Sequence, residues 1–149
     1  MDYSPNTRLE DRLGPNEPPY RSRGEAQVGR LLDRYGISFF YEMPTVVYDR
    51  GRFRVWQPDF TLPTYGNLIV EYAGMPDRPT YMDGVRHKQQ AYRANAMPAL
   101  FLYPTDLQGR SWPRHVVQRI EYSGQRARSQ RQGYRRGSCG RQSYRSVRS

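Results

Sequence analysis

Two carboxylates stand at the ends of apolar runs that a short turn separates. Asp59 follows Pro58 and precedes Phe60-Thr61-Leu62, and Glu71 follows Leu68-Ile69-Val70. Apolar runs bounded by Pro and Gly are typical of buried strands. If the runs pair as a hairpin, Asp59 lies beside or diagonal to Glu71. Two buried acids held together need a positive partner, and a divalent cation with oxygen ligands, most often Mg²⁺, is the usual one. The pair therefore predicts a metal site.

The single lysine is the second residue whose type is informative. Lys88 stands beside 23 arginines in this chain and falls on one helical stripe with Tyr81, Val85 and Tyr92. Arginine keeps its proton near neutral pH and is bulky, whereas an ammonium is compact and can act on a water or a phosphate oxygen as a point charge. These properties favour a functional role for Lys88. The alternative is a solvated side chain that extends past Tyr92.

A third acid begins the first helical pattern. Ser22-Arg23-Gly24-Glu25 has the spacing of a capping box, in which Ser22 is the N-cap and Glu25 the third helical residue. Glu25 also shares a helix face with Val28 and Leu32, which is the face that should turn toward the sheet. Glu25 is therefore either a capping residue or a member of the metal site.

The elements that must position these residues follow in a simple order. Hydrophobic periodicity and turn residues predict a helix, three strands, a helix, a strand and a helix, and Pro44 predicts an edge position or a kink in the first strand. The link from the third strand to the fourth has the length of a parallel crossover, so we expect an α/β fold around a mixed sheet. The predicted segments are 22–36, 37–48, 52–60, 67–72, 80–96, 98–103 and 111–122.

Composition predicts what lies on either side of that domain, residues 22–122. We expect a flexible N-terminal arm over residues 1–21 and a disordered tail over residues 123–149, which carries eight arginines and no carboxylate. The net charge of +10 favours a polyanionic partner, most often nucleic acid, although the tail could also be a solubilising end.

The remaining composition bears on compartment. Cys139 is the only cysteine, so an intrachain disulfide is excluded and a reducing compartment is favoured. There is no apolar run of membrane-spanning length and no signal-peptide pattern at Met1. We therefore expect an intracellular, cytoplasmic protein of a bacterial nucleoid or a phage-infected cell, with no membrane partner.

Pro58-Asp59, an eleven-residue spacer and Glu71-Tyr72-Ala73 together resemble the PD-(D/E)XK nuclease superfamily. The likeness runs from about Ser22 to Tyr103, and the superfamily's restriction-endonuclease-like core has the same order of elements. One position departs, because Ala73 stands where the motif lysine would fall. The placement of Lys88 and Tyr92 on the following helix resembles that in nuclease modules appended to certain DNA helicases, in which the lysine lies on the next helix. Archaeal-type Holliday junction resolvases share the core and the first-helix acid.

The resemblance implies a Mg²⁺-dependent phosphodiester hydrolase in which Mn²⁺ can substitute. Asp59, Glu71 and the backbone carbonyl of Tyr72 would hold the metal, and Glu25 would serve a second metal or the attacking water. Lys88 would position that water and stabilise developing charge. The remaining side chains would orient Lys88 or contact substrate: Tyr92, Gln89 and Gln90 near the scissile phosphate, and Arg50, Arg52 and Arg54 on the nucleic-acid backbone.

Two functions remain open at this point, with a third behind them. The first is a small stand-alone DNA endonuclease that acts in recombination or repair. For this function the sequence leaves three questions open: whether the substrate is branched or a Holliday junction, whether RNA is also cut, and whether the protein is a homodimer. The second is a non-catalytic nucleic-acid-binding module on a decayed nuclease fold. The third is a subunit that supplies nuclease activity to a larger repair or recombination assembly. Metal-dependent cleavage separates the first from the second.

Overall fold

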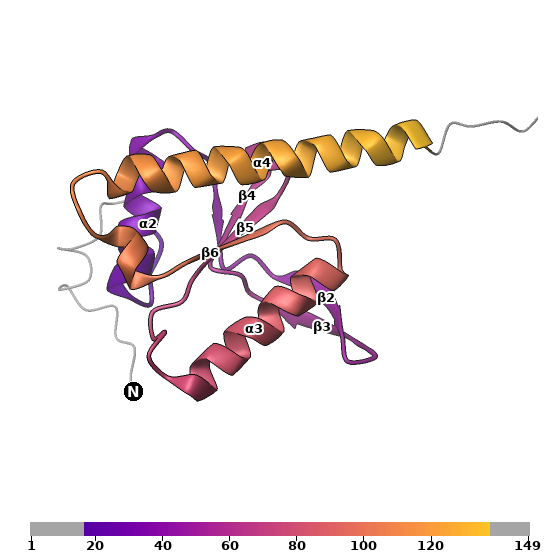
Figure 1. Ribbon diagram of the computed structural model, residues 1–149, viewed down its shortest axis with the longest axis horizontal. Coiled ribbons are helices and arrows are strands. Elements are labelled where there is room, and N and C mark those ends of the chain that lie inside the picture. The colour runs from indigo at the N-terminus through magenta and orange to yellow at the C-terminus, as the bar shows by residue number, and fades with distance from the viewer. Residues whose placement is uncertain (1–16, 138–149) are drawn as a thin grey trace, which may run out of the picture.

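The structure, a computed structural model, describes residues 17–137. Within that range the protein has a mixed α/β fold with three α-helices, a four-stranded mixed sheet and a separate two-stranded sheet (Figure 1). The elements are α2 (Arg23–Arg34), β1 (Phe40–Tyr41), β2 (Thr45–Asp49), β3 (Arg52–Trp56), β4 (Phe60–Leu62), β5 (Leu68–Tyr72), α3 (Pro79–Ala94), β6 (Ala99–Leu102) and α4 (Trp112–Gly137), with short 3-10 turns η1 (Pro63–Tyr65) and η2 (Pro104–Leu107).

The four-stranded sheet lies between two layers of helices (Figure 1). Its strand order is β1-β4-β5-β6, with β4 and β5 antiparallel and β5 and β6 parallel, so the predicted crossover through α3 is confirmed. Strand β5 is buried on both faces because its side chains alternate between the layers. Leu68 and Val70 pack in the core with α2 and α4, whereas Ile69 packs with α3. Glu71 therefore points to the α3 side of the sheet.

The first two predicted strands are each broken in the middle. Segment 37–48 divides into β1 and β2, and segment 52–60 divides into β3 and β4. The register is the same on both sides of the break, because Tyr41 pairs with Phe60 and Thr45 pairs with Trp56. Pro44 and Pro58 lie in the break, and a proline has no N–H to donate to a strand ladder. The prediction of one continuous strand over residues 52–60 is therefore wrong, whereas the interruption expected at Pro44 is confirmed.

Both outer boundaries of the predicted domain also need correction. Tyr20, which we assigned to a flexible arm, is 9% exposed and belongs to the core with α2 and α4. Helix α4 continues past Tyr122 to Gly137, so this part of the predicted disordered tail is helical. The reason is tertiary packing, since Gly124 lies against the ring of Tyr65 and Ala127 is buried. The remainder of both predictions, residues 1–16 and 138–149, lies outside the described residues.

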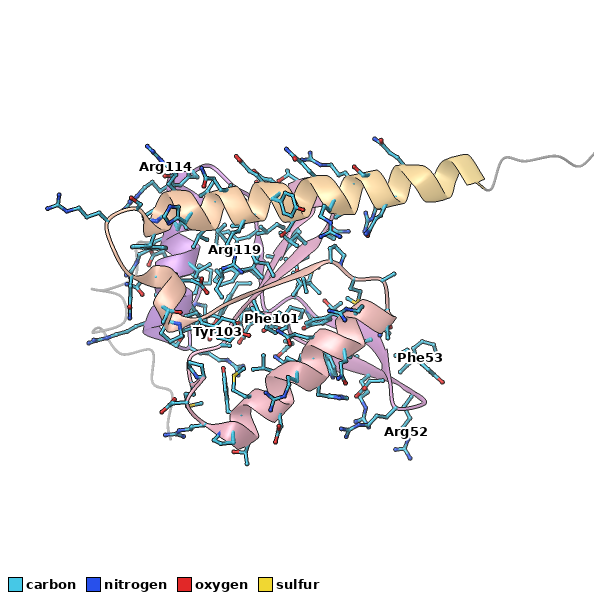
Figure 2. The ribbon with its side chains drawn as sticks, viewed as in Figure 1. Arg52, Phe53, Phe101, Tyr103, Arg114 and Arg119 are labelled. Atoms are coloured by element: carbon cyan, nitrogen blue, oxygen red, sulfur yellow. The ribbon has the colours of Figure 1, made fainter. Side chains whose placement is uncertain are left out.

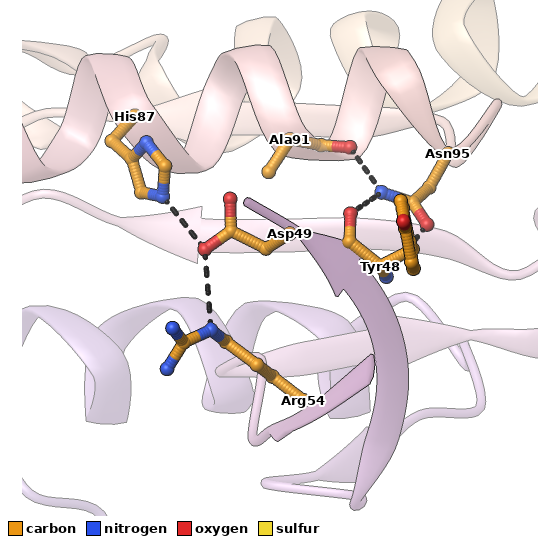
Figure 3. A network of polar contacts seen from close by, with 6 residues as sticks. All are labelled: Tyr48, Asp49, Arg54, His87, Ala91 and Asn95. Atoms are coloured by element: carbon orange, nitrogen blue, oxygen red, sulfur yellow. Dashed lines mark hydrogen bonds and ion pairs between the residues drawn. The ribbon is translucent and has the colours of Figure 1, made fainter. Parts of the chain in front are cut away.

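The two-stranded sheet is attached to α3 by polar side chains (Figure 3). The Asn95 amide accepts from the N–H of Tyr48 at 2.9 Å and donates to its carbonyl at 2.8 Å, as a neighbouring strand would. Asp49, 8% exposed, lies 3.0 Å from Nε2 of His87 and 3.6 Å from Nε of Arg54. These contacts fix the position of α3, which carries Lys88.

Among residues 17–137, none of the helices combines the length and the apolar character needed to cross a membrane.

Candidate functional site

The predicted acids and the lysine line one cavity of about 490 Å³. Strands β4 and β5 pair Phe60 with Val70, so the next position along the two strands sets Asp59 opposite Glu71. The cavity opens where this pair meets the first turn of α2 and the middle of α3. It is lined by Glu25, Asp59, Glu71 and Lys88, with Glu42 and Arg21 at its side. The juxtaposition expected from the hairpin is confirmed.

Glu71 is contacted by both Lys88 and Tyr92 of α3. Its carboxylate is 5% exposed, and Nζ of Lys88 lies 3.3 Å from each of its oxygens. The hydroxyl of Tyr92 donates to Oε1 at 2.5 Å. Burial and the Glu71 carboxylate raise the pKa of Tyr92 above its ordinary value, so this hydroxyl keeps its proton and remains a donor. The ammonium of Lys88 thus lies at the acidic cavity beside Glu71, although 43% of the Lys88 side chain is exposed.

Asp59 is the acid whose charge is least compensated. Burial, and then the neighbouring Glu71 carboxylate, raise the pKa of Asp59 to about 7, against the lowering effect of the Tyr72 N–H that donates to Oδ2. That hydrogen bond is 2.7 Å long and ties the end of β5 to the Asp59 side chain. The Lys88 ammonium, which lowers the pKa of Asp59, therefore compensates the two buried acids only in part.

Glu25 enters the cavity from α2 through its cap. Ser22 accepts a hydrogen bond from the N–H of Glu25 at 3.1 Å, as an N-cap residue does. The Glu25 side chain turns back to accept from the N–H of Arg21 at 3.2 Å and from the hydroxyl of Tyr41 at 2.5 Å. The capping and site roles of Glu25 are thus divided between its backbone and its side chain, and its carboxylate lies at the wall of the cavity.

The donor set fits a hard divalent cation. Asp59, Glu71 and Glu25 offer carboxylate oxygens, which Mg²⁺ prefers, and all three line the same cavity. In residues 17–137, however, no group of three or more His, Cys, Asp or Glu side chains is already gathered around one ion position. The Glu71 oxygens are occupied by Lys88 and Tyr92. Metal binding would therefore require Lys88 to move away from Glu71.

The other predicted contact residues lie outside this cavity. Gln89 is turned away from the cavity toward β6, where its amide lies 3.5 Å from the Tyr103 hydroxyl, and Gln90 is exposed. Arg50 and Arg52 are exposed at the tip of the two-stranded sheet. Arg54, on the same sheet, is held by Asp49, as described above. None of these five side chains is among those that line the cavity.

Two further residues of the cavity, Glu42 and Arg21, were not among the site residues predicted from the sequence. Both line the cavity, where Nε of Arg21 lies 2.6 Å from Oε1 of Glu42. Glu42 has a φ of 52°, a left-handed conformation that costs a non-glycine residue about 1–3 kcal/mol. Its N–H donates to the carbonyl of Asp59 at 3.1 Å across the broken hairpin. The one signal in the sequence was the position of Glu42 next to the Pro44 break.

Gly24 is a second residue that the sequence did not single out. A Cβ at this position would lie 1.9 Å from the ring of Tyr72, so only glycine lets that ring lie against α2. The ring therefore connects the end of β5 to the first turn of α2, the two places from which Glu71 and Glu25 enter the cavity.

The fold and the site define a mixed α/β protein in which an acidic cavity contains the chain's only lysine. No family model, curated protein or solved structure matches this chain.

Proposed function

We propose that this protein is a Mg²⁺-dependent nuclease with a restriction-endonuclease-like core, which hydrolyses phosphodiester bonds in DNA. The observation that carries the proposal is the meeting of Asp59, Glu71, Glu25 and Lys88 in one cavity. Carboxylates on adjacent strands and an amine from the following helix supply the two kinds of group that phosphodiester hydrolysis needs, a site for a cation and a point charge beside it.

The chemistry requires three changes at the scissile phosphate. The oxygen of a water bonds to phosphorus, the phosphorus–oxygen bond to the leaving nucleoside breaks, and a proton passes from the water to the leaving oxygen. Lys88 is placed to stabilise negative charge on the phosphoryl oxygens. Tyr92 holds the Glu71 carboxylate in orientation through its hydroxyl.

Asp59 and Glu71 would hold Mg²⁺, with Glu25 at the side of the same cavity. When bound, the cation neutralises charge on the phosphate and lowers the pKa of water. The chain's own residues prepare for this by keeping the two acids opposed and incompletely compensated. We therefore expect Mg²⁺ to relieve the repulsion that holds the Asp59 pKa high.

The decisive experiment is cleavage of plasmid, branched and single-stranded DNA with and without Mg²⁺. Glu71→Gln and Lys88→Arg should each abolish product, because the first removes a metal ligand and the second replaces the compact amine with a bulky fork. Glu121→Gln and Arg86→Ala are the matched controls, since both residues are exposed and lie outside the cavity. Mg²⁺-independent cleavage, or full activity of Lys88→Arg, would reject the proposal.

A second candidate function has a specific observation in its favour. Glu71 is already bonded to Lys88 and Tyr92, and Ala73 occupies the position of the motif lysine, as expected for a decayed site that binds nucleic acid without cutting it. Under this reading no metal-dependent product forms with any substrate. Binding persists and falls steeply with salt, because arginines and not the cavity provide the affinity.

A further inference from the structure

A second cavity lies beside the first and has the opposite charge. It has a volume of about 570 Å³ and runs over β6 between α3 and α4; we refer to it as the β6 groove. Strand β6 is the last strand of its sheet, so one of its edges is not paired with another strand. Figure 2 shows Phe101, Tyr103 and Arg119 in the space between the two helices. The groove is lined by Arg93, Arg119, Arg126, Gln89, Tyr103 and Tyr122, among others.

Positive charge in the groove is only partly neutralised. Its lining contains three arginines and no carboxylate. Arg119 is held by Asp106, which lies 2.9 Å from its Nη1. Arg126 lies 5.9 Å from the ring centre of Tyr122, a residue that is 63% exposed. An exposed ring beside an arginine can stack on a nucleobase while the guanidinium holds a phosphate. Charge and ring together fit a nucleic-acid strand.

The groove adjoins the acidic cavity. Helix α3 contributes to both hollows. The cavity is lined by Val85 and Lys88, and the groove by Gln89 and Arg93. Phe101 lines both. A strand whose scissile phosphate lies at Lys88 can therefore continue past α3 into the adjoining groove. Each hollow has the size of a small-ligand pocket, roughly 300–1,000 Å³, which suits a few nucleotides of one strand better than a duplex.

On the basis of the function proposed above, we propose that the β6 groove binds the single strand that continues from the scissile phosphate. Arg93 and Arg126 hold its phosphates, Arg119 is positioned by Asp106 to do the same, and Tyr122 stacks on a base. The substrate class is thus a nucleic acid that is single-stranded on at least one side of the cut, such as a flap, a fork or an overhang.

The test measures binding of the full chain to a labelled 15-nucleotide single strand in EDTA, where Mg²⁺-dependent cleavage cannot occur. The variants are Arg93→Ala and Arg126→Ala. The matched control is Arg114→Ala, which removes the same charge from an exposed residue of α4 that points away from the groove (Figure 2). Because the three variants have equal net charge, residues 138–149 and long-range attraction contribute equally to all of them.

We expect each groove variant to weaken single-strand binding several-fold and to reduce the slope of log K against log salt by about 0.7, while Arg114→Ala binds as the unaltered chain does. A 15-base-pair duplex should show a smaller effect of Arg93→Ala and Arg126→Ala. Equal losses in all three variants, or no loss in the groove variants, would overturn the proposal, and so would an effect confined to the duplex.

The binding test also separates this proposal from the nuclease proposal. Selective loss of binding in Arg93→Ala and Arg126→Ala, with no cleavage by the unaltered chain, would support the groove and reject the nuclease. Mg²⁺-dependent cleavage with unchanged binding in both groove variants would reject the groove and support the nuclease.

Discussion

Replacing Tyr92 with phenylalanine removes one hydrogen bond from the most buried acid in the cavity and little else. Tyr92 is 1% exposed. Its ring packs edge-on against Trp56 at a centroid distance of 5.6 Å and lies tilted against Phe101 at 6.2 Å. Phenylalanine keeps those ring contacts. The lost group is the hydroxyl that donates to Oε1 of Glu71.

The magnitude follows from the environment of Glu71. A hydrogen bond to a charged group contributes about 1.5–3 kcal/mol, and a buried acceptor that loses its donor bears the full desolvation penalty. Lys88 remains 3.3 Å from both carboxylate oxygens and compensates part of the loss. We therefore expect the free energy of unfolding to fall by about 1.5 kcal/mol, the lower end of that range.

Equilibrium urea unfolding, followed by far-ultraviolet circular dichroism, measures this change. Tyr35→Phe is the matched control, because Tyr35 is 47% exposed and its hydroxyl can be replaced by water. We expect the control to stay within about 0.5 kcal/mol of the unaltered chain. If Tyr92→Phe is no less stable than Tyr35→Phe, the Tyr92–Glu71 hydrogen bond does not support the cavity, and the reasoning from its geometry is wrong.

Three further perturbations test other parts of the same structure. The pKa of Asp59 is about 7 in the folded chain and 3.8 in an ordinary aspartate, so without metal the folded state binds more protons and the free energy of unfolding falls as pH rises from about 4 to 7. Urea unfolding should show that this fall is shallower in Asp59→Asn. Equal slopes of unfolding free energy against pH in the two proteins would contradict the pKa shift. Glu42 has a positive φ, a conformation that glycine adopts more readily than alanine. The free energy of unfolding of Glu42→Gly should therefore be about 1 kcal/mol higher than that of Glu42→Ala. Equal values for the two variants would exclude backbone strain at this residue. On α4, Gly124→Ala should lower the free energy of unfolding, because its Cβ would lie 2.4 Å from the Tyr65 ring. Gly133 has open space around it, so Gly133→Ala should raise the free energy of unfolding by about 0.5–1 kcal/mol in the same assay. Equal effects of the two substitutions would show that the helix beyond Tyr122 does not pack as described.

The sequence predicted those features that depend on neighbours along the chain. The pairing of Asp59 with Glu71 follows from two apolar runs joined by a short turn, because a tight connection leaves little choice of register. The helical stripe of Lys88 and Tyr92 follows from a spacing of four residues. A right-handed crossover then brings that helix back over the sheet, so the amine and the acids meet.

Features made by contacts between distant segments could not be predicted in the same way. Composition indicated disorder after Tyr122, yet Gly124 packs on Tyr65 and the helix continues. Here small residues act as packing surfaces, which propensity alone does not reveal. Arg21 lies in a segment without periodicity, and its contacts with Glu25 and Glu42 hold it at the cavity.

The order of residues was enough to predict the acids and the lysine of the site and the helices and strands that carry them. Hydrophobic spacing and turn residues act over a few neighbouring positions, so these features can be recognised without the fold. Only the tertiary structure decided where the hairpin breaks, which additional side chains surround the acids, and that an arginine-lined groove adjoins them. The physical reason is that burial and electrostatic compensation depend on every segment packed around a group, and those segments are far apart in the sequence.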